Sequence, residues 1–173
     1  MKTKILSFIL LLLCSCTTTM YVQNANNVDY TEPLAKIEFN KIICIVVPSD
    51  GTFDGNVYYG SGGYVQNTFT AYLQPFASKV IPVAQESYET DSKLWGAKYI
   101  IRPIITHWEP RAASWSGKAT RVEMYVSVFD LEQDKNIINT NLSVKGRSFT
   151  FTDQSAEELA RSLIIQFITD ITR

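Results

Sequence analysis

The sequence has few of the side chains on which most enzyme chemistry depends. Its 173 residues include one histidine, His107, and three cysteines, two of which fall within the first 16 residues. A Ser–His–Asp or Cys–His arrangement would have to use His107, and no Gly-x-Ser-x-Gly motif accompanies it. A zinc site needs three or four ligands, and the chain offers one histidine, the internal Cys44 and scattered acids. We therefore expect no enzyme activity, no cofactor and no metal.

The chain also has no excess of positive charge and no long apolar run. The chain has 16 lysines and arginines against 17 acidic residues, a formal net charge of −1, which argues against binding to nucleic acid. No apolar run reaches the roughly 20 residues of a transmembrane helix. The longest one, residues 5–13, follows Lys2 and Lys4 and ends in a short stretch of cysteine and serine. This pattern is typical of a secretory signal peptide.

Residues 13–16, Leu-Cys-Ser-Cys, resemble the lipobox of bacterial lipoproteins, in which an aliphatic residue and two small residues precede the cysteine that receives lipid. The resemblance implies lipidation of Cys16; an ordinary signal peptide cut nearby is the alternative. Thr17 occupies the position at which aspartate retains such proteins in the inner membrane, so the expected location is the periplasmic face of the outer membrane. The expected organisation is a signal peptide over residues 1–15, a lipidated cysteine and flexible tether over residues 16–36, and a single α/β domain over residues 37–173.

The hydrophobic pattern of the remaining chain predicts an α/β (α+β) domain built on one mixed sheet. The apolar run 42–47 is rich in β-branched residues and contains Cys44, which predicts a central strand buried on both faces and a buried, unreactive thiol. The first predicted elements are a strand over 42–47 and a helix from Ser61 that Pro75 ends, with Val65, Phe69, Tyr72, Leu73 and Phe76 on its buried face. An edge strand over 80–83, which contains Pro82, and a helix over 87–95 with Ser87 as N-cap follow. The last predicted elements are a strand over 98–108 bulged at Pro103, a hairpin of strands near 120–130 and 138–145, and a final helix with a capping box at 155–158. We expect about five strands with helices packed on them, in the order β-α-β-α-β-β-β-α.

The loop after the first strand, residues 48–63, holds five glycines and is the first candidate site. Its polar and aromatic candidates are Asp50, Asp54, Tyr58 and Tyr59. Residues 60–63 at a helix start could offer amide groups to an anion, but they lack the Gly-x-Gly-x-x-Gly spacing. Asp50, Asp54 and Asn56 could instead give oxygen ligands to calcium, although the loop lacks an EF-hand register. The structural alternative, which the pattern favours, is that the aspartates accept hydrogen bonds from turn amides.

The connection between two later strands, residues 106–118, is the second candidate site. It combines flat aromatic rings with charged or polar groups: His107, Trp108, Glu109, Arg111 and Trp115. Such a mixture is typical of recognition surfaces. The structural alternative is that one tryptophan closes the end of the core while Glu109 pairs with Arg111. The sequence leaves these two alternatives open.

Four short motifs lie in these two segments: Pro-Ser-Asp-Gly-Thr-Phe-Asp-Gly at 48–55, Tyr-Gly-Ser-Gly at 59–62, His-Trp-Glu at 107–109 and Trp-Ser-Gly-Lys at 115–118. They resemble a family of small Gram-negative lipoproteins known as domain of unknown function 4823. The resemblance implies a lipoprotein and its fold, and it supplies no activity. The element order is also similar to that of TolB amino-terminal domains, curli-secretion lipoproteins and outer-membrane activators of cell-wall synthases. That likeness implies a periplasmic protein that binds other proteins.

Two hypotheses about function follow, with a third that is less favoured. The first is a non-catalytic lipoprotein of the outer membrane that binds an envelope protein through residues 106–118 and 48–63. The alternative is a binder of envelope glycan or of a small ligand, with tryptophans and tyrosines as stacking platforms. The third is a hydrolase that uses His107 together with one of the nearby acids.

Overall fold

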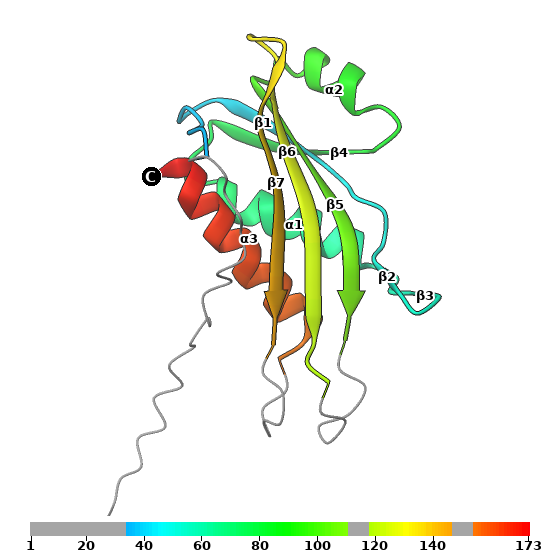
Figure 1. Cartoon of the computed structure of the whole chain (residues 1–173). Helices are drawn as coiled ribbons and strands as arrows, with labels where there is room; N and C mark the ends of the chain where they lie inside the picture. Colours follow the sequence, from blue (N-terminus) through cyan, green and yellow to red (C-terminus); the bar gives the residue numbers. More distant parts are fainter. Residues whose placement is uncertain (1–33, 111–117, 147–153) are drawn as a thin grey trace, which may run out of the picture.

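The fold is a five-stranded mixed sheet with helices on both faces (Figure 1). The computed structural model describes residues 34–110, 118–146 and 154–173. The strands stand in the order β4-β1-β5-β6-β7, and a small hairpin, β2-β3, forms a second sheet. The elements are β1 (Ile42–Val46), β2 (Thr52–Phe53), β3 (Asn56–Val57), α1 (Ser61–Leu73), β4 (Lys79–Val83), α2 (Tyr88–Leu94), β5 (Tyr99–Glu109), β6 (Arg121–Asp130), β7 (Lys135–Lys145) and α3 (Ala156–Thr172). The predicted fold class and element order are confirmed, and the small hairpin is an addition.

β1 lies inside the sheet and is buried on both faces. It pairs in parallel with β4 on one side and with β5 on the other. Ile43 and Ile45 face the larger cluster of buried residues, whereas Cys44 and Val46 face a smaller cluster on the opposite side. Burial raises the pKa of the Cys44 thiol, which keeps it protonated and unreactive. The prediction of a doubly buried central strand is confirmed.

β5, β6 and β7 form the antiparallel half of the sheet. The buried apolar side chains of β6 are those that the sequence pattern predicts, Val122, Met124, Val126 and Val128, and the polar Ser127 and Asp130 are buried as well. The register shift in β5 lies between Ile105 and His107, so the prediction of a bulge at Pro103 is wrong. Pro103 pairs in register with Val126 and lies beyond Ile101, the last residue of β5 that pairs with β1. At that point β5 has one neighbouring strand, a position that tolerates proline.

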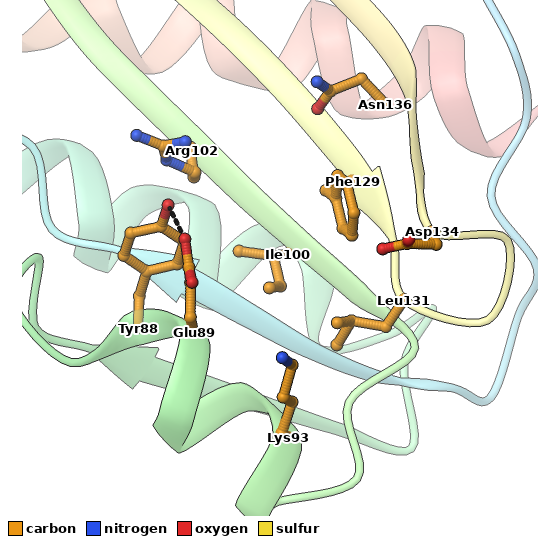
Figure 2. A pocket seen from close by; sticks show the side chains of 9 residues that line it. All are labelled: Tyr88, Glu89, Lys93, Ile100, Arg102, Phe129, Leu131, Asp134 and Asn136. Carbon is orange, nitrogen blue, oxygen red and sulfur yellow. Dashed lines mark hydrogen bonds between the residues drawn. The ribbon is translucent and has the colours of Figure 1, made fainter.

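α2 lies on one face of the sheet and covers only part of it. It packs against β1 and β4, where Tyr88 meets the smaller cluster of buried residues. α1 and α3 pack on the opposite face. The face of β5, β6 and β7 on the α2 side therefore has no covering helix within the described part of the chain, as Figure 2 shows beside α2.

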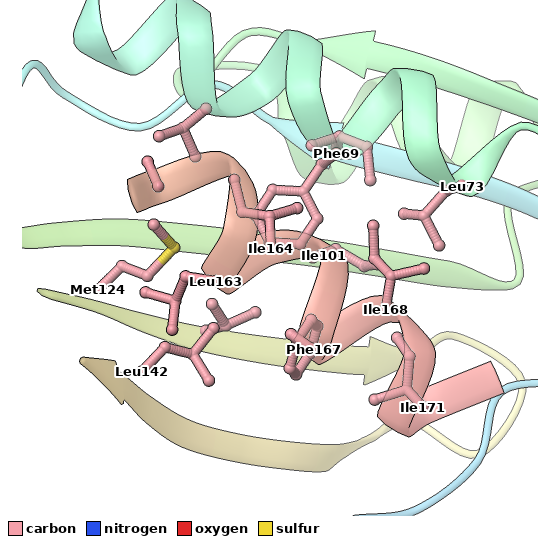
Figure 3. Packing of buried hydrophobic residues seen from close by; sticks show 14 of the residues in the cluster. Phe69, Leu73, Ile101, Met124, Leu142, Leu163, Ile164, Phe167, Ile168 and Ile171 are labelled. Carbon is pink, nitrogen blue, oxygen red and sulfur yellow. The ribbon is translucent and has the colours of Figure 1, made fainter. Parts of the chain in front are cut away.

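α1 and α3 cover the other face and bury the main core (Figure 3). α1 contributes Val65, Phe69 and Leu73. α3 contributes an apolar stripe of Leu159, Leu163, Ile164, Phe167, Ile168 and Ile171. The rings of Phe69 and Phe167 meet edge to face, with 6.0 Å between their centroids, so the two helices join each other as well as the sheet. None of the described helices is long and apolar enough to cross a membrane.

Two helix details differ from the sequence prediction, and one agrees. Tyr72, assigned to the buried face of α1, is 38% exposed because the helix buries a narrower stripe than expected. Ser87 precedes α2, but its hydroxyl bonds the Asp91 carboxylate at 2.6 Å and caps no backbone amide. The capping box of α3 is present: the Ser155 and Glu158 side chains each accept a hydrogen bond from the other residue's amide, both at 3.1 Å.

Lys98 ties three separate segments together at the start of β5. Its Nζ atom lies 2.6 Å from the Glu132 carboxylate, in the β6-β7 turn, and 2.5 Å from the Glu38 carboxylate, in the segment before β1. These hydrogen bonds, first that with Glu132 and then that with Glu38, raise the pKa of the Lys98 ammonium. The lysine therefore stays charged, although its side chain is largely buried.

Candidate functional site

The glycine-rich loop is held by the carboxylate of Asp50. Its Oδ1 atom accepts hydrogen bonds from the amides of Gly60 and Gly62, at 3.1 and 2.8 Å. In return, the Ser61 hydroxyl accepts a bond from the Gly51 amide at 2.8 Å. The amides of Gly60, Ser61 and Gly62, at the start of α1, therefore already have partners. Asp50 therefore accepts hydrogen bonds from backbone amides, as the structural alternative predicts.

Asp54 lies in the tight turn between β2 and β3. It and Gly55 both have positive φ, 49° and 75°, which is the conformation of a type I′ hairpin turn and suits an Asp-Gly pair. Asp54 is exposed. Among residues 34–110, 118–146 and 154–173, no three His, Cys, Asp or Glu side chains gather closely enough to hold a metal ion. The two aspartates serve different local roles, since the Asp50 carboxylate accepts hydrogen bonds from the amides of Gly60 and Gly62 and Asp54 is exposed in the turn.

Replacing Asp50 with alanine should lower the free energy of unfolding by about 1–2 kcal/mol. The substitution removes the acceptor of two amides at the start of α1. Urea unfolding followed by circular dichroism will measure the change. The matched control is Ser49→Ala, next in sequence, whose exposed side chain makes only a 3.5 Å contact with Gln85. Equal stability of the two variants would remove the structural role of Asp50.

Three of the predicted site residues, His107, Trp108 and Glu109, lie at the end of β5 and point to two different faces of the sheet. Trp108 is 1% exposed and packs into the main core, so its predicted role as a stacking platform is wrong. His107 and Glu109 face the opposite way, and His107 Nε2 lies 3.0 Å from Glu109 Oε2. Of the two alternatives, the tryptophan that closes the core is observed. Glu109 has His107 as its partner; Arg111, Trp115 and Cys16 lie outside the described residues.

The structure brings the two predicted segments together. The backbone of Gly51 approaches so closely that a Cβ atom there would lie 2.5 Å from Trp108 Cβ. The Phe53 ring meets the His107 ring at 5.1 Å, edge to face. Tyr58 packs partly against the core, whereas Tyr59 is 88% exposed. The β2-β3 hairpin and the end of β5 therefore form one continuous part of the molecule.

The uncovered face of β5, β6 and β7 is a second surface, which we call the open face. Its side chains come from alternate positions of the three strands: Ile100, Arg102, Ile104, His107 and Glu109 from β5, Arg121, Glu123, Tyr125, Ser127 and Phe129 from β6, and Asn139, Asn141, Ser143 and Lys145 from β7. The Tyr125 hydroxyl donates to Asn139 Oδ1 at 2.8 Å, and the Ser143 hydroxyl donates to Glu123 at 3.2 Å. The alternation in β6 predicts a face that meets water, and this prediction describes the open face.

A cavity of about 280 Å³ lies where the open face meets α2 (Figure 2). Ile100, Phe129 and Leu131 form its apolar lining. The Arg102 guanidinium stacks on the Tyr88 ring at 4.6 Å, a cation–π contact that holds both side chains at the rim. Burial raises the pKa of the Tyr88 hydroxyl, which donates to Glu89 at 2.9 Å. Sequence reasoning missed this cavity because its lining comes from α2, β5 and the β6-β7 hairpin.

Comparison with protein families gives one match, and it covers most of the chain. The family model described as Domain of unknown function (DUF4823) matches residues 35–171. This agrees with the family that the sequence motifs indicate. No curated protein sequence matches the chain.

Several solved structures are similar to the chain at low sequence identity. The PelC dodecamer from Paraburkholderia phytofirmans is 12% identical, with a TM-score of 0.64 and coverage of 82% of this chain and 95% of that one. Lipoprotein GNA1162 from Neisseria meningitidis is 14% identical, with a TM-score of 0.49 and coverage of 75% and 99%. The LpoB C-terminal domain from Salmonella enterica is 9% identical, with a TM-score of 0.39 and coverage of 68% and 91%. At 12% identity the likeness to the PelC structure concerns the fold alone.

Proposed function

The chain belongs to the family described as Domain of unknown function (DUF4823), and from that premise we propose that it is a non-catalytic binding module of the bacterial envelope. A lipid on Cys16 holds it at the periplasmic face of the outer membrane, and residues 16–36 are the tether. The domain captures an envelope protein on its open face. The resemblance of residues 13–16 to a lipobox supports the anchor.

The observation that carries this proposal is the unequal covering of the sheet. Two helices bury one face of the antiparallel half, whereas the open face has none within the described residues. That face combines the Tyr125 ring with amide, hydroxyl and charged groups, and ends in the cavity beside α2. Interfaces favour this mixture of aromatic and polar side chains, with arginine and tyrosine enriched at their centres.

The proposal assigns different roles to the predicted site residues. His107 and Glu109 contribute to binding, because they lie on the open face at the end of β5 away from the cavity. Asp54 and Tyr59 are exposed in the adjoining loop and extend the surface there. Trp108 lies in the core beneath this surface and fixes the end of β5, which carries His107 and Glu109. A hydrolase is not favoured, because His107 has one nearby carboxylate and no nucleophile among its described contacts.

A second candidate function is the binding of an envelope glycan or another small ligand in the cavity. Its volume approaches the lower end of the range of small-molecule sites, about 300–1,000 Å³. Tyr88 and Phe129 offer aromatic rings at its wall, and Arg102 offers hydrogen-bond donors. In this case the cavity binds the ligand, and the rest of the open face is solvent-exposed.

Photo-crosslinking in living cells tests the choice between the two. A photo-reactive residue replaces Tyr125 on the open face or, as a matched control, Tyr72 on the exposed side of α1. We expect a discrete adduct with another envelope protein at position 125 and none at position 72. A glycan adduct from a photo-reactive residue that replaces Phe129 in the cavity, with none at position 125, would support the second candidate. Equal labelling of both positions, or no adduct at 125, would contradict capture on the open face.

A further inference from the structure

The β7 edge of the sheet is long and, among the described residues, has no strand beside it. β7 is the last strand in the order, so within the described residues it pairs with β6 alone (Figure 1). It runs over 11 residues, Lys135–Lys145. Between its terminal lysines, residues 136–144 include no charged residue, no proline and no glycine. Edge strands that must stay single carry such residues, since unpaired amides and carbonyls otherwise recruit another strand.

The opposite edge of the same sheet is protected in the usual ways. β4 has only five residues, Lys79–Val83. Pro82 is its fourth residue and has no amide hydrogen to donate to another strand. Lys79 opens the strand, and its ammonium stacks on the Trp95 ring at 4.4 Å. The β4 edge is therefore protected against pairing with another strand, whereas the β7 edge is not. This difference indicates that β7 has a partner.

The side chains of β7 fit a second copy of the same strand. Ile138, Thr140, Leu142 and Val144 lie on the core side of the sheet and are buried, whereas Asn139, Asn141 and Ser143 lie on the open face. When two such strands pair antiparallel about a two-fold axis, residues directly opposite share a face. Apolar positions then meet apolar or threonine positions, and amides meet amides or hydroxyls. This self-complementarity is what an isologous interface requires.

We propose that β7 pairs with β7 of a second copy and joins the two sheets into one. Side-chain pairing and a bulge fix the register. A two-fold axis at Leu142 would place Asn139 opposite the second copy's Lys145, whereas an axis at Asn141 places Asn139 opposite Ser143 and Ile138 opposite Val144. The register shift of the β6-β7 pair lies near Asn136 and interrupts the edge there. Ile137 is the extra residue of that shift, so the regular segment is residues 138–145. An axis at Asn141 pairs residues 138–144 with the same residues of the second copy and stays clear of the bulge, whereas an axis at Thr140 would leave only residues 138–142 paired outside it.

This register makes a specific prediction for cysteine crosslinking of the full-length chain in cells. Asn141 lies opposite its own copy, so Asn141→Cys brings two cysteines within disulfide range. Cys44 is buried and does not compete. The matched control is Thr90→Cys, exposed on α2. With added oxidant we expect a covalent dimer of Asn141→Cys at roughly ten times the level of Thr90→Cys, a difference that corresponds to contact against chance collision.

A second measurement uses no crosslink. We expect the full-length chain, purified in detergent, to sediment as a dimer, and Asn141→Lys to weaken the dimer about fivefold because two lysines then face each other. Asn141→Ser, which keeps a polar uncharged group, should leave it intact. Asn141 is exposed in the single chain, so Asn141→Lys should lower the melting temperature only through the weaker dimer, and Asn141→Ser should leave it unchanged. A monomeric wild-type chain, or crosslinking at 141 no stronger than at 90, would overturn the pairing, whatever adduct position 125 gives.

Discussion

Replacing Trp108 with alanine should lower the free energy of unfolding by about 3–5 kcal/mol, the largest loss expected for a single side chain here. Trp108 is 1% exposed and lies against the Gly51 backbone. Its removal leaves a cavity between β5 and the glycine-rich loop, two parts that cannot close together without moving the β2-β3 hairpin. Because domains are typically stable by about 5–15 kcal/mol, the variant should be partly unfolded at 37 °C. Urea titration followed by circular dichroism will measure the change.

The matched control is Trp95→Ala. Trp95 is 48% exposed, and the contact that it loses is the stacking of Lys79 on its ring. Exposed contacts of this kind contribute about 0.5–1 kcal/mol. Had Trp108 been a recognition residue, its variant would keep wild-type stability and lose only the adduct at position 125. That outcome would contradict the core position and restore the role that the sequence suggested.

Elements with a strong repeating pattern were predictable, because burial of one face imposes the period. β6 alternates along its length, and four valine or methionine side chains enter the core. α3 combines a capping box at Ser155 with a stripe of apolar residues at helical spacing. β1 has no period, yet its β-branched run and Pro48 identified a strand buried on both faces. In each case the local pattern and the tertiary contacts agree.

The face occupied by Trp108 was not predictable, because it depends on one extra residue. Along β5, Ile100, Arg102 and Ile104 point to the open face, and strict alternation would place Trp108 with them. The register shift between Ile105 and His107 reverses the alternation, since a slip of one residue exchanges the two faces of a strand. A bulge leaves little trace in a single sequence. The composition of residues 106–109 therefore suited a binding loop and a core plug equally well.

The cavity beside α2 was hidden for another reason. Its lining residues are separated by up to 48 positions in sequence, from Tyr88 to Asn136. They meet because α2 lies over β1 and β4 and ends before the antiparallel half begins. That placement follows from the strand order of the whole sheet, to which no segment alone points. The stacking of Arg102 on Tyr88 is likewise a tertiary contact without a local signal.

The glycines at the start of α1 give the second large effect, and neighbouring positions should respond in opposite directions. Gly62→Ala should lower the free energy of unfolding by about 3 kcal/mol. The added Cβ would lie 2.2 Å from the carbonyl oxygen of Pro48 and 3.3 Å from Asp50 Oδ1. The Pro48 oxygen belongs to the backbone that leaves β1, so it cannot move aside without displacing the loop from the helix. Thermal unfolding followed by circular dichroism will measure the loss.

Gly63→Ala is the matched control, one position further along the same helix. No atom lies within 4 Å of a Cβ added there, and its φ is not positive. Alanine in a helix loses less chain entropy on folding than glycine, so this variant should gain about 0.5–1 kcal/mol. A shared loss at both positions would mean that the helix start tolerates no side chain at all. Opposite signs would show that the close approach of Gly62 to Pro48, and not glycine flexibility, fixes how the loop enters α1.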